Sequence, residues 1–202
     1  MTLYNIQIKF ENNLESINRS RKRMERLFSK KILIQNDLYQ TYRGLFLSTI
    51  TSFETYIEEL FYHIITTSDK PVLRKYKPII IFKNESIARA IVHVDKKYLD
   101  WLPFDRAQKR LEIYCSRMDS FKSIDKNEEN ALREMITVRN VLAHSSSHSK
   151  DVFLKAISSY KLPPKEQTPV GYLRSVYRIT PDETRFELYQ NYLISISKKF
   201  IA

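Results

Sequence analysis

An arginine, an asparagine and a histidine occur within six residues, in the segment RNVLAH at 139–144. Arginine offers a planar, permanently charged group that suits a phosphate, and histidine exchanges protons near neutral pH. Cleavage of RNA requires little else, because the substrate's own 2′-hydroxyl is the nucleophile. A base takes its proton, an acid protonates the leaving 5′-oxygen, and fixed positive charge holds the phosphate. Arg139 and His144 would therefore suffice for cleavage of RNA without a metal or another cofactor.

Helical geometry decides how these side chains can meet. Residues 127–143 carry apolar side chains at three- and four-residue steps, which predicts a helix that ends near His144. On an ideal helix a step of five residues rotates by about 140° and rises by about 7.5 Å, so Arg139 and His144 do not share a face. Asn140 lies one turn before His144, and we expect it to hold the imidazole in one orientation. The negative end of the helix dipole favours the protonated imidazole.

One histidine cannot easily serve both sides of a phosphate. A two-fold dimer that pairs the helix at 127–144 with its mate would bring two histidines and two arginines to one groove. The alternative is a structural role, in which Arg139 caps carbonyls or pairs with a carboxylate and His144 is an ordinary surface residue.

The other histidines are weaker candidates for chemistry. His144 and His148 have the spacing of two metal ligands on one helix, but the serines at 145–147 predict the end of that helix, and no carboxylate stands close enough to complete a site. We expect His63 and His93 to be packing residues within helices. The sequence therefore predicts no metal site.

Periodicity along the whole chain predicts an all-α fold, a single-domain helical bundle with a short irregular or β segment before the C-terminal helix. No repeat or linker divides the sequence. The expected elements are a basic N-terminal helix at 1–31, a long central helix at 36–67, a helical pair at 84–117, the motif helix at 127–144, a loop-rich segment at 145–180 and a C-terminal helix at 181–201.

Prolines and caps set several of these boundaries. Two prolines indicate an irregular connection at 69–82, and Pro103 suits the first turn of a helix at 104–117. Thr180 with Glu183 has the pattern of a capping box for the last helix. The helix at 104–117 is expected to carry an exposed ion-paired face, made of Asp105, Arg106, Lys109, Arg110 and Glu112.

Composition excludes several classes of protein. The chain has 202 residues, 43% hydrophobic and 28% charged, which is typical of a globular domain. Its two glycines are too few for the turns of an all-β fold, for a Rossmann fold or for a P-loop.

Cys115 is the only cysteine, so no internal disulfide can form, as is usual in a reducing compartment. There is no signal-peptide pattern and no apolar run approaching 18 residues. We expect a cytoplasmic protein without membrane association.

Net charge points to an acidic partner. The chain carries 34 basic and 23 acidic residues, and 34 − 23 gives +11. Nucleic acid is the commonest partner of such a protein, so we expect RNA. Seven of the thirteen residues at 19–31 are basic. They can form a solvated helix face, a face that follows phosphates or, with less support, a membrane-surface helix, because Met24, Leu27 and Phe28 are better explained as core contacts.

The segment at 139–144 resembles the Arg-Asn-x-x-x-His motif of the HEPN superfamily, whose small helical bundles include metal-independent ribonucleases of toxin–antitoxin and phage-defence systems. SFETYIEELF at 52–61 is similar to the aromatic-Glu-x-aromatic centre of that family's long second helix. YLDWLP at 98–103 is similar to a connector of its RiboL-PSP type. The resemblance spans residues 36–200.

This resemblance implies a role for each motif residue. Arg139 would bind the scissile phosphate, His144 would transfer protons and Asn140 would support them, at a homodimer interface that yields a 2′,3′-cyclic phosphate product. Glu54 would contact the motif arginine. An antitoxin or regulatory protein is a further possible partner. Because many HEPN proteins have lost catalysis, the alternative function is an inactive helical module that binds RNA or a protein partner.

Overall fold

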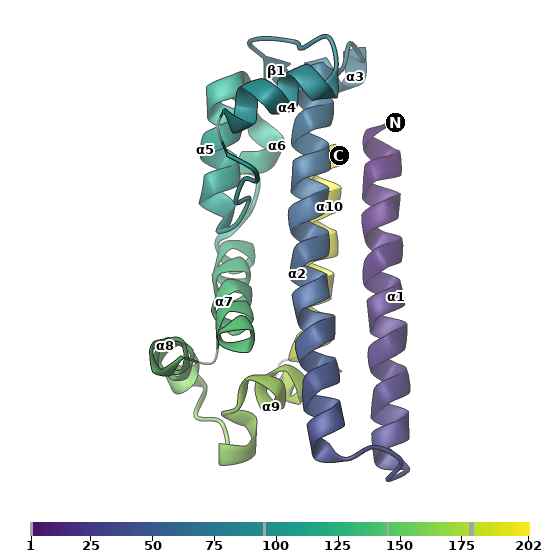
Figure 1. Cartoon of the computed structure of the whole chain (residues 1–202), viewed down its shortest axis with the longest axis vertical. Coiled ribbons are helices and arrows are strands. Elements are labelled where there is room, and N and C mark those ends of the chain that lie inside the picture. The colour runs from purple at the N-terminus through teal and green to yellow at the C-terminus, as the bar shows by residue number, and fades with distance from the viewer. Residues whose placement is uncertain (1, 95, 145, 178–179) are drawn as a thin grey trace.

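Four long helices form the framework of the chain: α1 (Leu3–Ser29), α2 (Gln35–Thr66), α7 (Lys126–Ala143) and α10 (Arg185–Ile201). The computed structural model describes residues 2–94, 96–144, 146–177 and 180–202. Helices α1 and α2 run side by side, α10 lies behind α2, and α7 packs on the opposite side of α2 from α1 (Figure 1). The expected all-α helical bundle is confirmed.

Shorter elements complete the bundle. They are the helices α3 (Lys70–Lys75), α4 (Glu85–His93), α5 (Phe104–Tyr114), α6 (Asp119–Lys122), α8 (Ser147–Ile157) and α9 (Pro169–Arg174), and the 3₁₀ turns η1 (Ser158–Tyr160) and η2 (Pro164–Glu166). Two antiparallel strand pairs join β1 (Tyr76–Pro78) to β2 (Cys115–Met118) and β3 (Val176–Tyr177) to β4 (Thr180–Thr184). Within the described ranges, no helix has both the length and the apolar character needed to cross a bilayer.

Aromatic side chains stack where α10 meets the rest of the core. The ring of Phe200 is fully buried and lies 4.1 Å from that of Phe121, centroid to centroid, with the two planes 7° apart. Phe104 and Tyr56 stack on the same ring at 5.7 and 6.4 Å. These contacts join α2, α5, α6 and α10, so the last turn of the C-terminal helix fixes the upper end of the bundle.

The start of α7 is held by a capping box and a buried ion pair. Asp125 accepts hydrogen bonds from the amides of Asn127 and Glu128, at 2.8 and 3.0 Å. The Glu128 carboxylate, only 3% exposed, accepts from Lys199 on α10 at 2.6 Å. Because both cap and ion pair act within the first turn, the whole motif helix is fixed relative to α10.

The segment at 69–117 differs from its prediction. Its first part is not wholly irregular, since it forms α3 and the strand β1. The helix predicted to run towards residue 100 ends at His93, because Val94 adopts a left-handed backbone with φ 52° that an α-helix cannot continue. The helix that begins at Phe104, as predicted, stops at Tyr114, since the next residues pair with β1 instead.

The segment at 145–180 is more helical than the predicted loop. It contains α8 and α9, each begun by a side-chain cap, Ser146 for α8 and Thr168 for α9. The C-terminal helix begins at Arg185, four residues later than expected, and its capping box is Thr184 with Glu187. Thr180 belongs to β4 instead. Residues 178 and 179 of the predicted short strand lie outside the described residues.

Candidate active site

One face of α7, which we call the uncovered face, is exposed or half-buried in the part of the chain that the structure describes. Its exposed positions fall three or four residues apart, while the positions between them are buried against α2 and α10. The uncovered face carries Asn130, Arg133, Thr137, Asn140 and, at the end of the helix, His144. Asn140 and His144 therefore share one face, as their spacing predicts.

Arg139 lies at the edge of this face and is half-buried. Its Nη1 donates to the side-chain oxygen of Asn140 at 3.1 Å. The backbone carbonyl of Asn140 accepts the amide hydrogen of His144 at 2.8 Å. The structure thus differs from the expectation that Asn140 orients the imidazole: its side chain engages the guanidinium, and only its backbone engages His144.

Glu54 lies on α2, in the electrostatic field of the motif arginine. Burial raises the pKa of this carboxyl above its usual range, while the positive charge of Arg139 opposes the rise. The negative charges of Asp100 and Glu58 add to the rise. The half-buried carboxyl of Glu54 therefore feels the charge of Arg139, but no hydrogen bond or ion pair joins these two described residues, so the direct contact that the resemblance implies is not made.

His144 is the C-cap of α7 and has an extended backbone, with φ −125° and ψ 103°. The hydroxyl of Ser149 donates to its backbone carbonyl. Ser146, the cap of α8, accepts the amide hydrogen of Ser149 at 3.2 Å. The backbone of His144 is thus held from both sides while the residue itself is exposed. Ser145 lies outside the described residues.

The histidines do not form a metal centre. His148 belongs to α8, so the four-residue spacing does not place it on the same helix as His144. Among the residues that the structure describes, no group of three or more histidine, cysteine or acidic side chains could hold a metal ion. The ring of His93 stacks on that of Tyr62 at 6.4 Å, and burial lowers the pKa of His63. Both therefore serve as packing residues, as expected.

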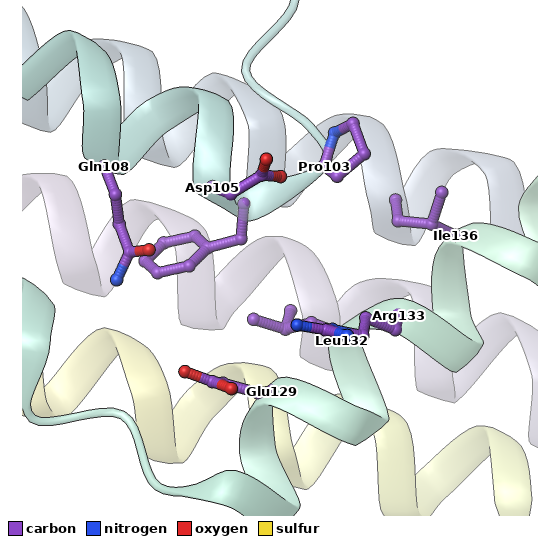
Figure 2. Close-up of a pocket in the computed structure, with 8 residues that line it drawn as sticks. Pro103, Asp105, Gln108, Glu129, Leu132, Arg133 and Ile136 are labelled. Carbon is purple, nitrogen blue, oxygen red and sulfur yellow. The ribbon is translucent and has the colours of Figure 1, made fainter.

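A pocket of about 360 Å³ lies between the start of α5 and the first half of α7 (Figure 2). Pro103, Asp105 and Gln108 line it from the α5 side, and Glu129, Leu132, Arg133 and Ile136 line it from α7. Its charged groups are of both signs. The pocket ends one turn before Arg139 and includes none of the motif residues, so it is not the candidate active site.

Sequence reasoning missed the surroundings of Glu54. Asp100, which precedes α5, forms an ion pair with Arg106 at 2.7 Å. The prediction that Arg106 is paired within its own helix is therefore wrong. Glu58, one turn after Glu54 on α2, pairs with Arg89 of α4. The four-residue spacing of Glu54 and Glu58 was the available signal, whereas contacts from α4 and the connector depend on tertiary packing.

Searches against protein-family models, curated proteins and solved structures find no match for this chain.

Proposed function

We propose that the chain is a metal-independent endoribonuclease of HEPN type that cleaves RNA at a homodimer interface. One observation carries the proposal. Arg139 is paired with Asn140 at the end of α7, in the field of Glu54, and the exposed His144 follows one turn later. These are the residue types that the cleavage reaction requires, with Asn140 and His144 exposed and Arg139 half-buried.

The proposed reaction is an internal transfer at phosphorus. One imidazole takes the proton of the 2′-hydroxyl as its oxygen forms a bond to phosphorus. The bond from phosphorus to the 5′-oxygen breaks, and a protonated imidazole gives that oxygen its proton. The guanidinium of Arg139, held by Asn140, stabilises the charge that builds on the other phosphate oxygens. The products are a 2′,3′-cyclic phosphate and a free 5′-hydroxyl.

The uncovered face of α7 is the proposed dimer surface. The reaction needs a base and an acid on opposite sides of the phosphate, and each chain offers one histidine at this place. A two-fold axis close to His144 would supply the second imidazole and a second Arg139. The polar character of the face suits an interface that also admits RNA.

Glu54 supports the arginine in this proposal. A carboxyl beside a guanidinium limits the directions in which that side chain can point. Burial raises the pKa of Glu54 and disfavours its ionised form, whereas the positive charge of Arg139 favours that form. We assign Glu54 the role of a positioning residue that acts on Arg139 through its charge, and the proton transfers to His144.

Cleavage assays with purified protein test the proposal. The chain is incubated with labelled RNA in EDTA, and the ends of the products are analysed for a cyclic phosphate. We expect cleavage by the parent chain and a loss of at least about 100-fold for Arg139→Ala and for His144→Ala. Asn127→Ala, an exposed asparagine in the first turn of α7 and not among the residues of the proposed dimer surface, is the matched control and should cleave like the parent.

Two results would contradict this function. Absence of cleavage, with RNA still bound, would favour the alternative of an inactive RNA-binding module. Cleavage that persists in both motif variants would assign the activity to other residues. If the enzyme acts in the cytoplasm as a toxin or a phage-defence factor, its expression should slow growth, and His144→Ala should relieve that effect.

A further inference from the structure

A second pocket, of about 500 Å³, lies between α5 and the connector that precedes it. In Figure 1 this connection runs beside α5, on the side towards α2. The side chains relevant to a ligand are Lys96, Tyr98, Asp100, Arg106, Lys109 and Arg110. Four of these are basic and one is acidic, so the pocket is a local concentration of positive charge.

The cations of this pocket are of two kinds. Arg106 and Arg110 are fixed by the chain, the first by its ion pair with Asp100 and the second by the ring of Trp101, which lies 4.4 Å below the guanidinium. Lys96 and Lys109 have no ion pair with any described residue. The two lysines are therefore available to phosphates.

An exposed aromatic ring lies beside these cations. Tyr98 is 76% exposed, a large fraction for a tyrosine in a protein whose other aromatic residues are mostly buried. Rings of this kind bind the faces of unstacked bases, and neighbouring lysines bind the backbone. The combination is typical of surfaces that hold single-stranded nucleic acid.

Arg110, which lines the pocket, is packed among aromatic side chains. The indole nitrogen of Trp101 and the hydroxyl of Tyr62 are buried and have no hydrogen-bond partner among the described residues. Both rings neighbour Arg110, which lies over one and acts electrostatically on the other. The ring contact with Trp101 keeps the guanidinium of Arg110 in place at the wall of the pocket.

The pocket is electrostatically connected to the candidate active site. Asp100, which lines the pocket, acts on Glu54, and Glu54 also feels Arg139. A strand whose scissile phosphate lay on Arg139 could therefore extend past Glu54 towards Lys109 and Tyr98. The geometry agrees, because Pro103 and Asp105 at the start of α5 line a common pocket with Ile136, one turn before Arg139 on α7.

We infer that this pocket is an RNA subsite, in which Tyr98 stacks on a base of single-stranded RNA and Lys96 and Lys109 bind its phosphates, next to the linkage that is cleaved. The inference rests on the proposed function for its substrate class. It adds a site that binds nucleotides of the RNA strand next to the phosphate that reacts.

The test measures binding and cleavage separately. A fluorescein-labelled single-stranded RNA 12-mer is titrated by anisotropy with chains that carry His144→Ala, so that the probe stays intact. We expect Tyr98→Ala to weaken binding by about tenfold and Tyr98→Phe to retain it, since phenylalanine keeps the ring. Lys109→Ala should weaken binding and reduce the salt dependence by about 0.7 in the slope of log K against log salt. Lys70→Ala, an exposed lysine on α3, is the matched control.

Cleavage by the same variants with His144 intact separates the two proposals. We expect Tyr98→Ala and Lys109→Ala to raise KM while kcat changes little. If the parent cleaves RNA and both variants bind and cleave like it, the subsite is wrong and the nuclease stands. If no chain cleaves but both variants lose RNA binding, the subsite stands and the catalytic proposal is wrong. A parent chain that binds no RNA would overturn the subsite as well.

Discussion

Arg139 donates a hydrogen bond to the side chain of Asn140, its immediate neighbour, at 3.1 Å. Adjacent residues on a helix point in directions about 100° apart, so such a contact requires the long arginine side chain to turn back along the helix. The asparagine thereby places the guanidinium at the border of the uncovered face of α7. Without that hydrogen bond, the packing of α7 against α2 would be the main constraint on the position of the Arg139 side chain.

Removal of the Asn140 side chain should therefore act through Arg139. We expect Asn140→Ala to reduce kcat for RNA cleavage by about 10- to 100-fold, because the guanidinium loses its orientation. Asn140 is exposed, so the thermal midpoint should change little. Comparison with Asn127→Ala, an exposed asparagine of the same helix outside the proposed dimer surface, controls for general effects of truncation. Equal activity of both variants would show that the contact has no catalytic role.

We expect the ionised carboxylate of Glu54 to lower the stability of the folded chain at neutral pH. Burial raises the pKa of this carboxyl in the folded chain above its value in the unfolded chain. The folded chain therefore prefers the protonated carboxyl, which contributes fully to stability at pH values below the unfolded pKa. This contribution is lost as the pH rises through the folded pKa and the group ionises. Glu54→Gln removes the ionisation, and the variant should have a higher thermal midpoint than the parent at pH 7.5 and no such advantage at pH 4. Thermal unfolding followed by circular dichroism at the two pH values measures this difference.

The same Glu54→Gln variant should lose activity while it gains stability. The amide no longer attracts Arg139, and we expect a moderate fall in kcat/KM for RNA cleavage. A variant that is more stable and equally active would restrict Glu54 to a structural role.

The ion pair between Lys199 and Glu128 should stabilise the start of the motif helix. In Lys199→Met the buried carboxylate keeps its other hydrogen bonds but loses its cation, and we expect a loss of about 1–3 kcal/mol in the free energy of unfolding. The double variant Lys199→Met with Glu128→Gln should recover much of that loss, since no charge is then left buried. Urea titration measures both, and additive effects would contradict a direct coupling.

The aromatic stack around Phe200 should be the most sensitive part of the core. Phe200→Ala removes a ring that contacts three others, and we expect a loss of about 3–5 kcal/mol in urea unfolding. Phe200→Leu should lose less, because it leaves a smaller cavity. If alanine costs no more than leucine, the stack does not hold α10 against the bundle.

The long helices were predictable because each buries a continuous apolar stripe. Residues of α2 such as Phe46, Phe53 and Leu60 follow one another at helical spacing, and all are buried. The start of the last helix was not predictable, because two Thr-x-x-Glu patterns follow one another there, at 180–183 and 184–187. The first lies in the strand β4, and the second caps α10. The strand pair of Tyr76 with Met118 joins residues that are distant in sequence, so no local pattern could indicate it.

The positions of the candidate site residues on α7 were predictable, and their contacts were less so. The spacing of Asn140 and His144 correctly indicates a shared face. The pairing of Asn140 with Arg139 depends on rotamers, which a helical wheel does not contain. The charged neighbourhood of Glu54 depends on where the connector at Asp100 packs, which the local sequence does not determine.

The requirement for two chains at one phosphate is the central claim, and mixed dimers test it most directly. Parent and His144→Ala chains are refolded together in equal amounts, and RNA cleavage in EDTA is compared with that of the parent alone at the same total concentration. If each reaction needs an imidazole from both chains, random pairing leaves about one quarter of the dimers active, so the rate should fall to about one quarter. A rate of about one half would mean that each chain cleaves on its own, which would contradict the account.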